Sequence, residues 1–468
     1  MTRLSKGLFA GLLAFLPLVA FAQSPPSIKG PDERFKTDIL VVVAHPDDEA
    51  AVTPYLARAI YDEHKRVAVV YGTRGGSGAN EYRRETGPAL ADVREQEARQ
   101  ACAALSITHV WFLDGKDTAS QNVLESLANW GHGKNLEEMV RLVRLTRPDV
   151  IITWLPAIFI GEDHGDHQAA GVLATEAFDL ANDPTAFPSQ IAGASKRLEP
   201  YLENLTPWQP KKIYYFSDAS DQKPFVGSGP AYSIKEVSPS QHKPYWRLAL
   251  DAAKSHVTQF PGEIEQLSKM SDAQLQQMID NPKTSWWTDP LTLIFGKSLV
   301  SAKPTDDVFS HIADRIPEYH PQSAHLLKTV VAAQPLELGG PWAFYSHFYP
   351  AHELANLPVP KTPEIGIKAG TTLSVPLVLL HDETKPVEVE LKVTAPDSWK
   401  VLGGAGKFIL PAEKSTALRI DIETPALSTE ALKTAAPQEI TVSAFANEKS
   451  LGEVKLQVKL VSGGLPQN

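Results

Sequence analysis

The sequence predicts an α/β protein: a mostly parallel sheet with helices on both faces, then a helical and irregular middle region, and finally a C-terminal β-sandwich. Three observations predict this order. Short apolar runs alternate with amphipathic stretches from Asp38 to Val150, irregular proline-rich sequence follows from Phe260, and apolar–charged alternation begins after Pro363. Strands separated by helices are typical of parallel sheets, whereas short alternating strands in succession are typical of sandwiches.

The first residues have the pattern of a secretory signal peptide, residues 1–22. Arg3 and Lys6 precede an apolar run from Leu8 to Ala22 that closes on Ala-Phe-Ala. The run is too short for a spanning helix, and an uncleaved N-terminal anchor is the alternative. We therefore expect cleavage after Ala22 and a secreted or periplasmic protein with no membrane span after signal removal.

Composition limits the chemistry. The 468 residues carry a formal net charge of −10, and Cys102 is the single cysteine. The acidic balance argues against nucleic acid as a partner. One cysteine excludes an internal disulfide and a cysteine metal cluster, so His, Asp, Glu or backbone groups must supply any reactive atoms. The length predicts two or three domains.

The first unit has four predicted strands and three predicted helices between residues 38 and 154. The strands are short apolar runs, as in buried parallel sheets, over 39–44, 67–71, 110–113 and 150–154. The helices are amphipathic stretches over 48–65, 92–105 and 136–147. In such sheets ligands bind beyond the C-terminal ends of the strands, so chemistry is expected there.

The later regions carry different signals. Residues 262–360 read as helical and irregular, with Trp286 and Trp287, and they have no assignable role. After a proline-spaced linker, apolar and charged residues alternate from Val387 to Val393, and similar alternation recurs further on. This pattern predicts a small β-sandwich over 361–462.

Two clusters of acids and histidines each follow a predicted strand. Residues 44–49 read Ala-His-Pro-Asp-Asp-Glu, and residues 162–167 read Glu-Asp-His-Gly-Asp-His. Either cluster alone is more often a solvated turn or a helix cap. Burying so much charge needs a compensating cation, and two clusters at strand ends can together fill the coordination shell of one metal ion.

The residue types in these clusters predict a catalytic zinc site with one ion per chain. Catalytic zinc takes three nitrogen or oxygen ligands and keeps a position open for water, which His45, Asp48 and His167 would satisfy. Asp47 is then left beside the metal as general base for the bound water. His164 could stabilise a developing oxyanion or protonate the leaving amine.

These motifs give the sequence a resemblance to a known family. The motif Ala-His-Pro-Asp-Asp-Glu with a later His-x-Asp-His is similar to the PIG-L/LmbE-like deacetylases. The glycine-rich stretch 73–78, the Arg-x-x-Glu helix beginning at Arg94 and the segment 256–259 extend the resemblance over about half the chain. Where the family commonly has Gly-Glu in its glycine turn, this chain has Gly75-Gly76.

The resemblance implies a Rossmann-like deacetylase domain over 36–261 that uses zinc to hydrolyse N-acetyl groups of glucosamine-containing substrates. It implies His45, Asp48 and His167 as zinc ligands. It also implies Asp47 as the base and His164 as the electrostatic or acid partner. Arg94 would reach a substrate oxygen, with a helix salt bridge to Glu95 or Glu97 as the alternative. Asp166 would orient a ligand histidine or cap the helix, and Asp117 would line the sugar site or form part of a turn.

We therefore expect a zinc-dependent hydrolase that removes an acetyl or other acyl group from an N-acetylated amino sugar or a related small amide. Its partner would be a small-molecule or glycan substrate. The segment 395–399, Ala-Pro-Asp-Ser-Trp, resembles Ig-like modules of secreted glycosidases.

Three other interpretations stay open. A dinucleotide-binding oxidoreductase would use the glycines of 72–78, although the first strand lacks a G-x-G-x-x-G motif. A catalytically idle wall- or glycan-binding protein could retain the fold. An amidase could act on a non-sugar amide, because loops such as 188–210 set the choice of substrate.

Overall fold

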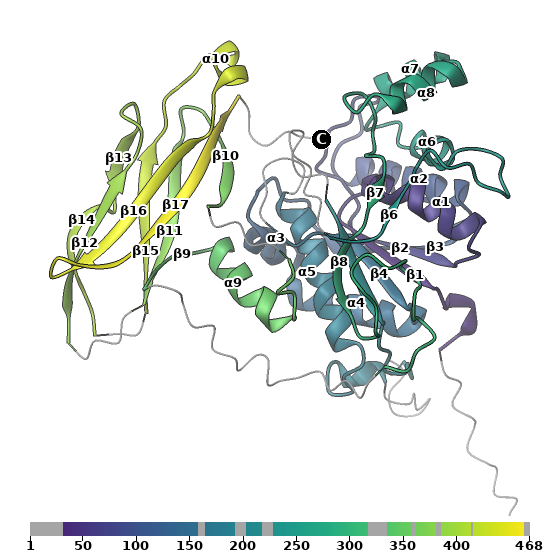
Figure 1. Ribbon diagram of the computed structural model, residues 1–468, viewed down its shortest axis with the longest axis horizontal. Coiled ribbons are helices and arrows are strands. Elements are labelled where there is room, and N and C mark those ends of the chain that lie inside the picture. Colours follow the sequence, from purple (N-terminus) through teal and green to yellow (C-terminus); the bar gives the residue numbers. More distant parts are fainter. Residues whose placement is uncertain are drawn as a thin grey trace, which may run out of the picture.

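The computed structural model describes residues 31–157, 164–191, 203–217, 228–316, 335–357, 362–380, 385–412 and 415–462. The predicted signal peptide lies outside these ranges, as do Glu162 and Asp163 of the second cluster and residues 358–361 of the linker. A sheet flanked by helices occupies one side of the view in Figure 1, and a group of long strands occupies the other. Within the described ranges, no helix combines the length and apolar character needed to cross a membrane.

The first unit is built on a six-stranded sheet with the order β3-β2-β1-β4-β5-β8. The strands are β1 (Ile39–Val43), β2 (Val67–Thr73), β3 (His109–Gly115), β4 (Val150–Trp154), β5 (Lys212–Phe216) and β8 (Ile294–Ser298). The first five run parallel, and β8 pairs antiparallel with β5. β1 lies in the middle with all five residues buried, as its unbroken run of apolar residues requires. The predicted α/β fold with a parallel-rich sheet is confirmed.

Strand order changes direction between β1 and β4. From β1 the chain continues through β2 to β3 on one side, and it returns to pair β4 on the other side. Parallel strands that diverge in this way leave a crevice at their C-terminal ends, where α/β proteins bind ligands. Both predicted clusters follow these two strands.

Helices pack in two groups around the sheet (Figure 1). One group contains α1 (Thr53–Tyr61), α2 (Pro88–Ala104) and α6 (Tyr245–Ala253), and the other contains α3 (Val123–Trp130), α4 (His132–Thr146) and α5 (Gly165–Leu180). The prediction of a single helix over 48–65 is wrong in detail. It starts as the 3-10 turn η2 (Asp48–Val52), and it ends at Tyr61, shortly before His64 adopts a positive φ of 54°.

The region 262–360, which the sequence left without a role, contributes to both units. It contains α7 (Pro261–Lys269), α8 (Asp272–Asp280), β7 (Leu291–Thr292), which pairs with β6 (Ala231–Tyr232), and then β8, β9 (Leu336–Leu338) and α9 (Pro341–Ala351). β8 completes the first sheet, and β9 pairs with β11 of the C-terminal unit. The first hydrophobic core therefore continues beyond residue 261, with residues as distant as Leu357.

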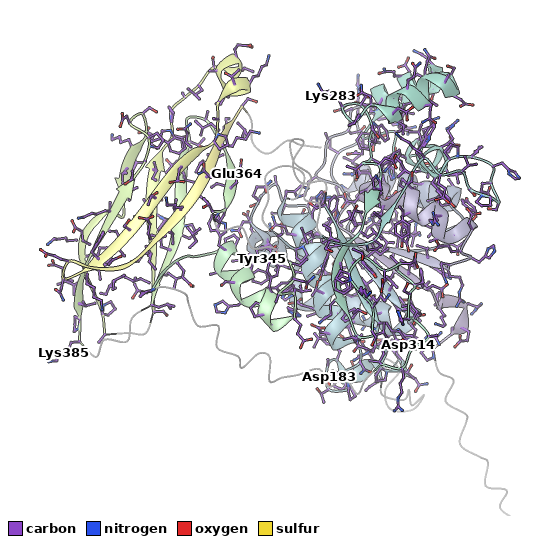
Figure 2. The ribbon with its side chains drawn as sticks, in the orientation of Figure 1. Asp183, Lys283, Asp314, Tyr345, Glu364 and Lys385 are labelled. Atoms are coloured by element: carbon purple, nitrogen blue, oxygen red, sulfur yellow. The ribbon has the colours of Figure 1, made fainter. Side chains whose placement is uncertain are left out.

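Helix α9 returns the chain from β9 to the first unit. Tyr345, labelled in Figure 2, donates its hydroxyl to Gln168 Oε1 at 2.8 Å, and Tyr349 donates to the carbonyl oxygen of Pro156 at 2.7 Å. Trp342 at the start of α9 packs against both hydrophobic cores. The two units are thus joined by buried contacts as well as by the chain.

The C-terminal unit contains two sheets that share one core. One has the order β10-β17-β16-β12-β14, and the other β13-β15-β11-β9. Their strands are β10 (Glu364–Lys368), β11 (Thr372–Leu380), β12 (Val387–Thr394), β13 (Lys400–Gly403), β14 (Gly406–Leu410), β15 (Ser415–Glu423), β16 (Gln438–Ala446) and β17 (Lys449–Val461), with the short helix α10 (Thr429–Thr434) between β15 and β16. Val375 from one sheet and Val442 from the other belong to the same buried cluster. The strands of this region pair antiparallel, with β10 and β17 as a parallel exception.

Candidate active site

The described residues of the two sequence clusters meet at the C-terminal ends of β1 and β4. The chain turns through His45 to Asp48 directly after β1, and His164 caps the start of α5 after β4. Because β1 and β4 are neighbours in the sheet, His45 Nδ1 comes within 3.3 Å of His167 Nε2 although the two residues are far apart in sequence.

Three donor atoms form a nearly equilateral triangle. His167 Nε2 lies 3.3 Å from both His45 Nδ1 and Asp48 Oδ1, and His45 Nδ1 lies 3.6 Å from Asp48 Oδ1. In a tetrahedral site with metal–ligand bonds of about 2.0–2.1 Å, ligand atoms are roughly 3.3–3.4 Å apart. The donor set and its spacing therefore fit a divalent ion such as zinc.

Asp48 presents one oxygen to this triangle. Its Oδ2 accepts hydrogen bonds from the backbone N–H groups of Ala44 and His45, both at 2.9 Å, and from Trp154 Nε1 at 2.7 Å. Oδ1 faces the two histidines. With three donors holding Oδ2, the carboxylate is set to bind through Oδ1 alone.

Trp154 is a site residue that sequence reasoning missed. Besides its bond to Asp48, its ring stacks on His167 with 4.0 Å between centroids and 5° between planes. One buried indole thus orients two of the three donors. The only signal in the sequence was its place as the last residue of the strand before the second cluster.

Asp166 lies behind His45. Its Oδ2 is 3.3 Å from His45 Nε2 and accepts the backbone N–H of Thr118 at 2.7 Å. Burial alone would lower the pKa of His45, but hydrogen bonds with Asp166 and Asp48 raise it well above its usual value. The ring therefore sits in a negative environment that favours a cation. A carboxylate on the far nitrogen of a ligand histidine is a common support for metal sites.

Other side chains border the triangle. Potential ligand atoms of His45, His164 and His167 lie within 4.8 Å of one another, as do those of His45, Asp117 and Asp166. The structure therefore brings Asp117 to the site, where its Oδ2 accepts the backbone N–H of Ser77 at 2.7 Å.

His164 packs against the donor set. Its Nδ1 accepts the backbone N–H of Asp166 at 3.3 Å, and its ring lies 4.1 Å from that of His167. Burial lowers the pKa of His164, and the charges of His167 and His45 lower it further. Because Nδ1 accepts the N–H of Asp166, a neutral ring carries its proton on Nε2. It can donate one hydrogen bond from Nε2.

Asp47, the neighbour of Asp48 in sequence, directs its carboxylate to Arg94. Its backbone has φ 124° and ψ −24°, a conformation that costs a residue other than glycine about 1–3 kcal/mol. Its Oδ2 lies 3.1 Å from Arg94 Nη2. Burial raises the pKa of Asp47 to about 6, although the charge of Arg94 acts in the opposite direction. A carboxylate of that basicity is suited to accepting a proton.

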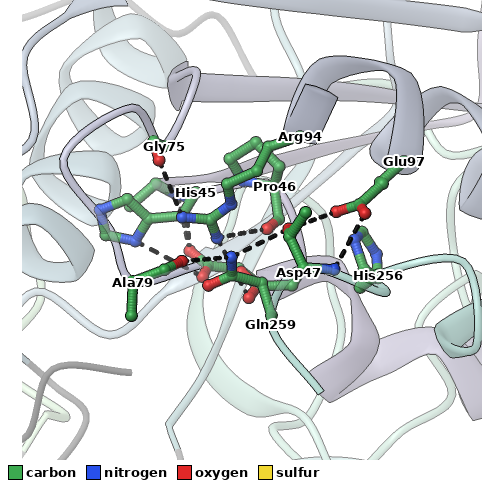
Figure 3. A network of polar contacts seen from close by, with 12 residues as sticks. His45, Pro46, Asp47, Gly75, Ala79, Arg94, Glu97, His256 and Gln259 are labelled. Atoms are coloured by element: carbon green, nitrogen blue, oxygen red, sulfur yellow. Dashed lines mark hydrogen bonds and ion pairs between the residues drawn. The ribbon is translucent and has the colours of Figure 1, made fainter. Parts of the chain in front are cut away.

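Arg94 is buried beneath this turn rather than paired along its own helix. It donates to the carbonyl oxygens of Pro46 at 2.7 Å and Gly75 at 3.1 Å (Figure 3). Gly75 has φ +70°, and a Cβ there would lie 2.5 Å from Arg94 Nη1. Gly75, the glycine that this turn shares with the Gly-Glu pattern, thus leaves the space that the guanidinium occupies.

Comparisons with known proteins point to one family. The family model "PIG-L: GlcNAc-PI de-N-acetylase" matches residues 40–178, which include both clusters. The 1D-myo-inositol 2-acetamido-2-deoxy-alpha-D-glucopyranoside deacetylase of Thermobifida fusca is 26% identical over 47% of this chain and 82% of its own. One of two such deacetylases of Frankia casuarinae is 31% identical over 44% of this chain and 70% of its own.

Among solved structures, the N,N'-diacetylchitobiose deacetylase of Pyrococcus horikoshii is 20% identical, with a TM-score of 0.35, and the match covers 49% of this chain and 73% of that one. The family assignment rests on the sequence relatives, because the Frankia casuarinae enzyme is matched over more than two thirds of its length. On that similarity and the family match, the chain belongs to the PIG-L family.

Proposed function

We propose that this protein is a zinc-dependent deacetylase that hydrolyses the acetamide of an N-acetylated amino sugar or a related small amide. The observation that carries the proposal is the triangle of His45 Nδ1, Asp48 Oδ1 and His167 Nε2, with edges of 3.3–3.6 Å and Asp47 beside it. The relatives named above are deacetylases of an acetamido-deoxy-glucopyranoside, which supports the same bond as the target.

The protein's own groups divide the remaining work. A zinc ion held by the triangle would supply an activated water molecule and polarise the acyl oxygen. Asp47 accepts the proton of the attacking water and passes it to the leaving nitrogen, so that the amide C–N bond breaks to give acetate and the free amine. His164 donates from Nε2 to the developing oxyanion or to the leaving nitrogen.

We assign the surrounding residues by their contacts. Asp166 orients His45, and Asp117, on the glycine-turn side of the site, receives a sugar hydroxyl. Arg94 is buried and bonded to Asp47 and two carbonyl groups, so we assign it to holding Asp47 rather than to direct contact with substrate.

The domain limits follow the hydrophobic cores. We propose a hydrolase unit from about residue 36 to Leu357, because residues beyond 261 complete its sheet and core. The unit over 361–462 is proposed to be an Ig-like module that holds the substrate near the site. Export to the periplasm through residues 1–22 remains a prediction.

A substrate panel with metal analysis tests the proposal. Purified protein is assayed for free amine with N-acetylglucosamine, its glycosides and oligosaccharides, and N-acetylated aliphatic amines of similar size, and its zinc content is measured in parallel. We expect zinc to be present and sugar acetamides to be turned over fastest. If only the aliphatic amides are turned over, the protein is an amidase that acts on non-sugar amides. If protein with its full metal content hydrolyses none of the amides, it is a binding protein.

A further inference from the structure

A buried carboxylate holds the backbone of Asp47. The N–H of Asp47 donates to Glu49 Oε2 at 3.1 Å, across the turn that gives Asp47 its positive φ. Glu49 is 3% exposed, so water cannot easily replace this bond. A strained backbone persists only where surrounding contacts hold it, and this is one of those contacts.

The other oxygen of Glu49 is bound by a residue from a distant part of the chain. His256 Nε2 lies 2.7 Å from Glu49 Oε1, and His256 is 1% exposed. Because a carboxylate only accepts, the ring nitrogen donates. His256 follows α6, so Glu49 links the turn after β1 to a segment about two hundred residues later.

The segment 256–259 is itself fixed on α2 and on the glycine-rich turn (Figure 3). Glu97 accepts the backbone N–H of Thr258 at 2.9 Å and its hydroxyl at 2.6 Å. Gln259 Nε2 donates to the carbonyl oxygen of Ala79 at 2.9 Å. His256 is therefore presented to Glu49 from a rigid support.

We infer that Glu49 is a positioning residue for Asp47, and that His256 fixes Glu49 in this task. Arg94 holds the carboxylate of Asp47 from one side, while Glu49 holds its backbone from the other. Asp47 is thus held against Arg94 by both of its contacts, while Asp48 joins the triangle. This inference rests on the proposed role of Asp47 as the base.

Isosteric replacement of Glu49 tests the inference. Two donors, the Asp47 N–H and His256 Nε2–H, meet the two oxygens of Glu49, whereas a glutamine offers one oxygen and an N–H group. Glu49→Gln is expected to lower kcat by about 10- to 10²-fold, the scale for a misplaced catalytic group, with KM and zinc content unchanged. Full kcat in this variant would overturn the inference.

Substitutions at His256 separate positioning from stability. His256→Phe removes the donor and should lower kcat as Glu49→Gln does. His256→Gln keeps an N–H group that reaches equally far from the backbone, so it should retain much of the kcat. The matched control is His352→Phe, which removes a His–carboxylate pair of equal length, 2.7 Å to Asp179, at the far end of α5. It should lower the melting temperature and leave kcat intact. Equal kcat losses in His256→Phe and the control would contradict a positioning role.

Combination with Asp47→Asn completes the test. If Glu49 acts through Asp47, Glu49→Gln should lower kcat by less than about twofold in the Asp47→Asn background, because the effects of interacting sites are not additive. The same loss in both backgrounds would refute the inference while leaving the role of Asp47 intact. Unchanged turnover in Asp47→Asn alone would instead refute the proposed function on which the inference rests.

Discussion

The indole of Trp154 contacts two of the three candidate metal ligands: its N–H donates to Asp48 Oδ2 at 2.7 Å, and its ring stacks on His167. Trp154→Phe keeps an aromatic ring for stacking but removes the hydrogen bond. We expect zinc affinity to fall by about 10- to 10²-fold, the usual effect of losing a group that orients a ligand. Competition with a chromophoric chelator measures it.

The control for this substitution is Trp208→Phe. Trp208 also donates its indole N–H over 2.7 Å, to the carbonyl oxygen of Pro148, but that contact lies at the opposite ends of the strands, just before β4 and β5 begin. Zinc affinity should stay unchanged in Trp208→Phe. Equal zinc affinity in both variants would show that Trp154 does not support the ligands.

Metal removal should abolish activity. One triangle of donors predicts about one zinc ion per chain. Prolonged dialysis against a strong chelator is expected to remove zinc and turnover together, and added zinc should restore both. His45→Ala and His167→Ala should each lose metal and activity, whereas His311→Ala, an exposed histidine paired with Asp314, should keep them. Activity that survives complete removal of divalent ions would rule out the mechanism.

Gly75 gives a test of the support beneath Asp47. Alanine at this position would be strained at φ +70°, and its Cβ would press on Arg94. Gly75→Ala should therefore lower both the melting temperature and kcat, as Arg94 moves away from Asp47. In the control, Gly133→Ala, a Cβ meets nothing within 4 Å and the residue lies inside α4, so stability should hold or rise. Normal kcat in Gly75→Ala would show that Arg94 does not need this space.

The C-terminal unit is expected to be dispensable for chemistry on small substrates. A chain that ends near Val359 keeps both clusters, α9 and the first core, but leaves β9 without its partner β11. We expect most turnover on a small soluble amide to remain, with a lower melting temperature because Leu336 and Trp342 lose contacts with the second core. Folded protein without turnover would show that the unit shapes the site, and activity on polymeric glycan could fall separately.

Much of the first unit could be predicted because its signals are local. The apolar run 39–43 reads directly as a buried strand, and the acids and histidines after it stand at its end. Their meeting with His167 was predictable because the C-terminal ends of parallel strands share one edge of the sheet.

Other features depend on distant contacts that no local pattern reveals. β8 carries Gly296 and Lys297 and joins the sheet as its edge strand, through pairing with β5. The short β9 belongs to one unit, and α9 directly after it packs on the other. The contacts of Arg94 with Asp47 and with the carbonyl oxygens of Pro46 and Gly75 are of this kind, and its expected contact with substrate stays a prediction. Such contacts depend on tertiary packing.

Zinc content measured beside turnover in Asp47→Asn and Asp48→Asn tests the central claim most directly. Asp48 Oδ1 faces the histidines, while Asp47 faces Arg94. The two substitutions should therefore have different effects on zinc content and turnover. Asp47→Asn is predicted to keep about one zinc ion per chain while turnover falls by about 10²-fold or more, the scale for losing a positioned base. Asp48→Asn is predicted to bind zinc more weakly. Loss of zinc in Asp47→Asn with full zinc in Asp48→Asn would reverse the two roles, and normal turnover in both would place the active site elsewhere.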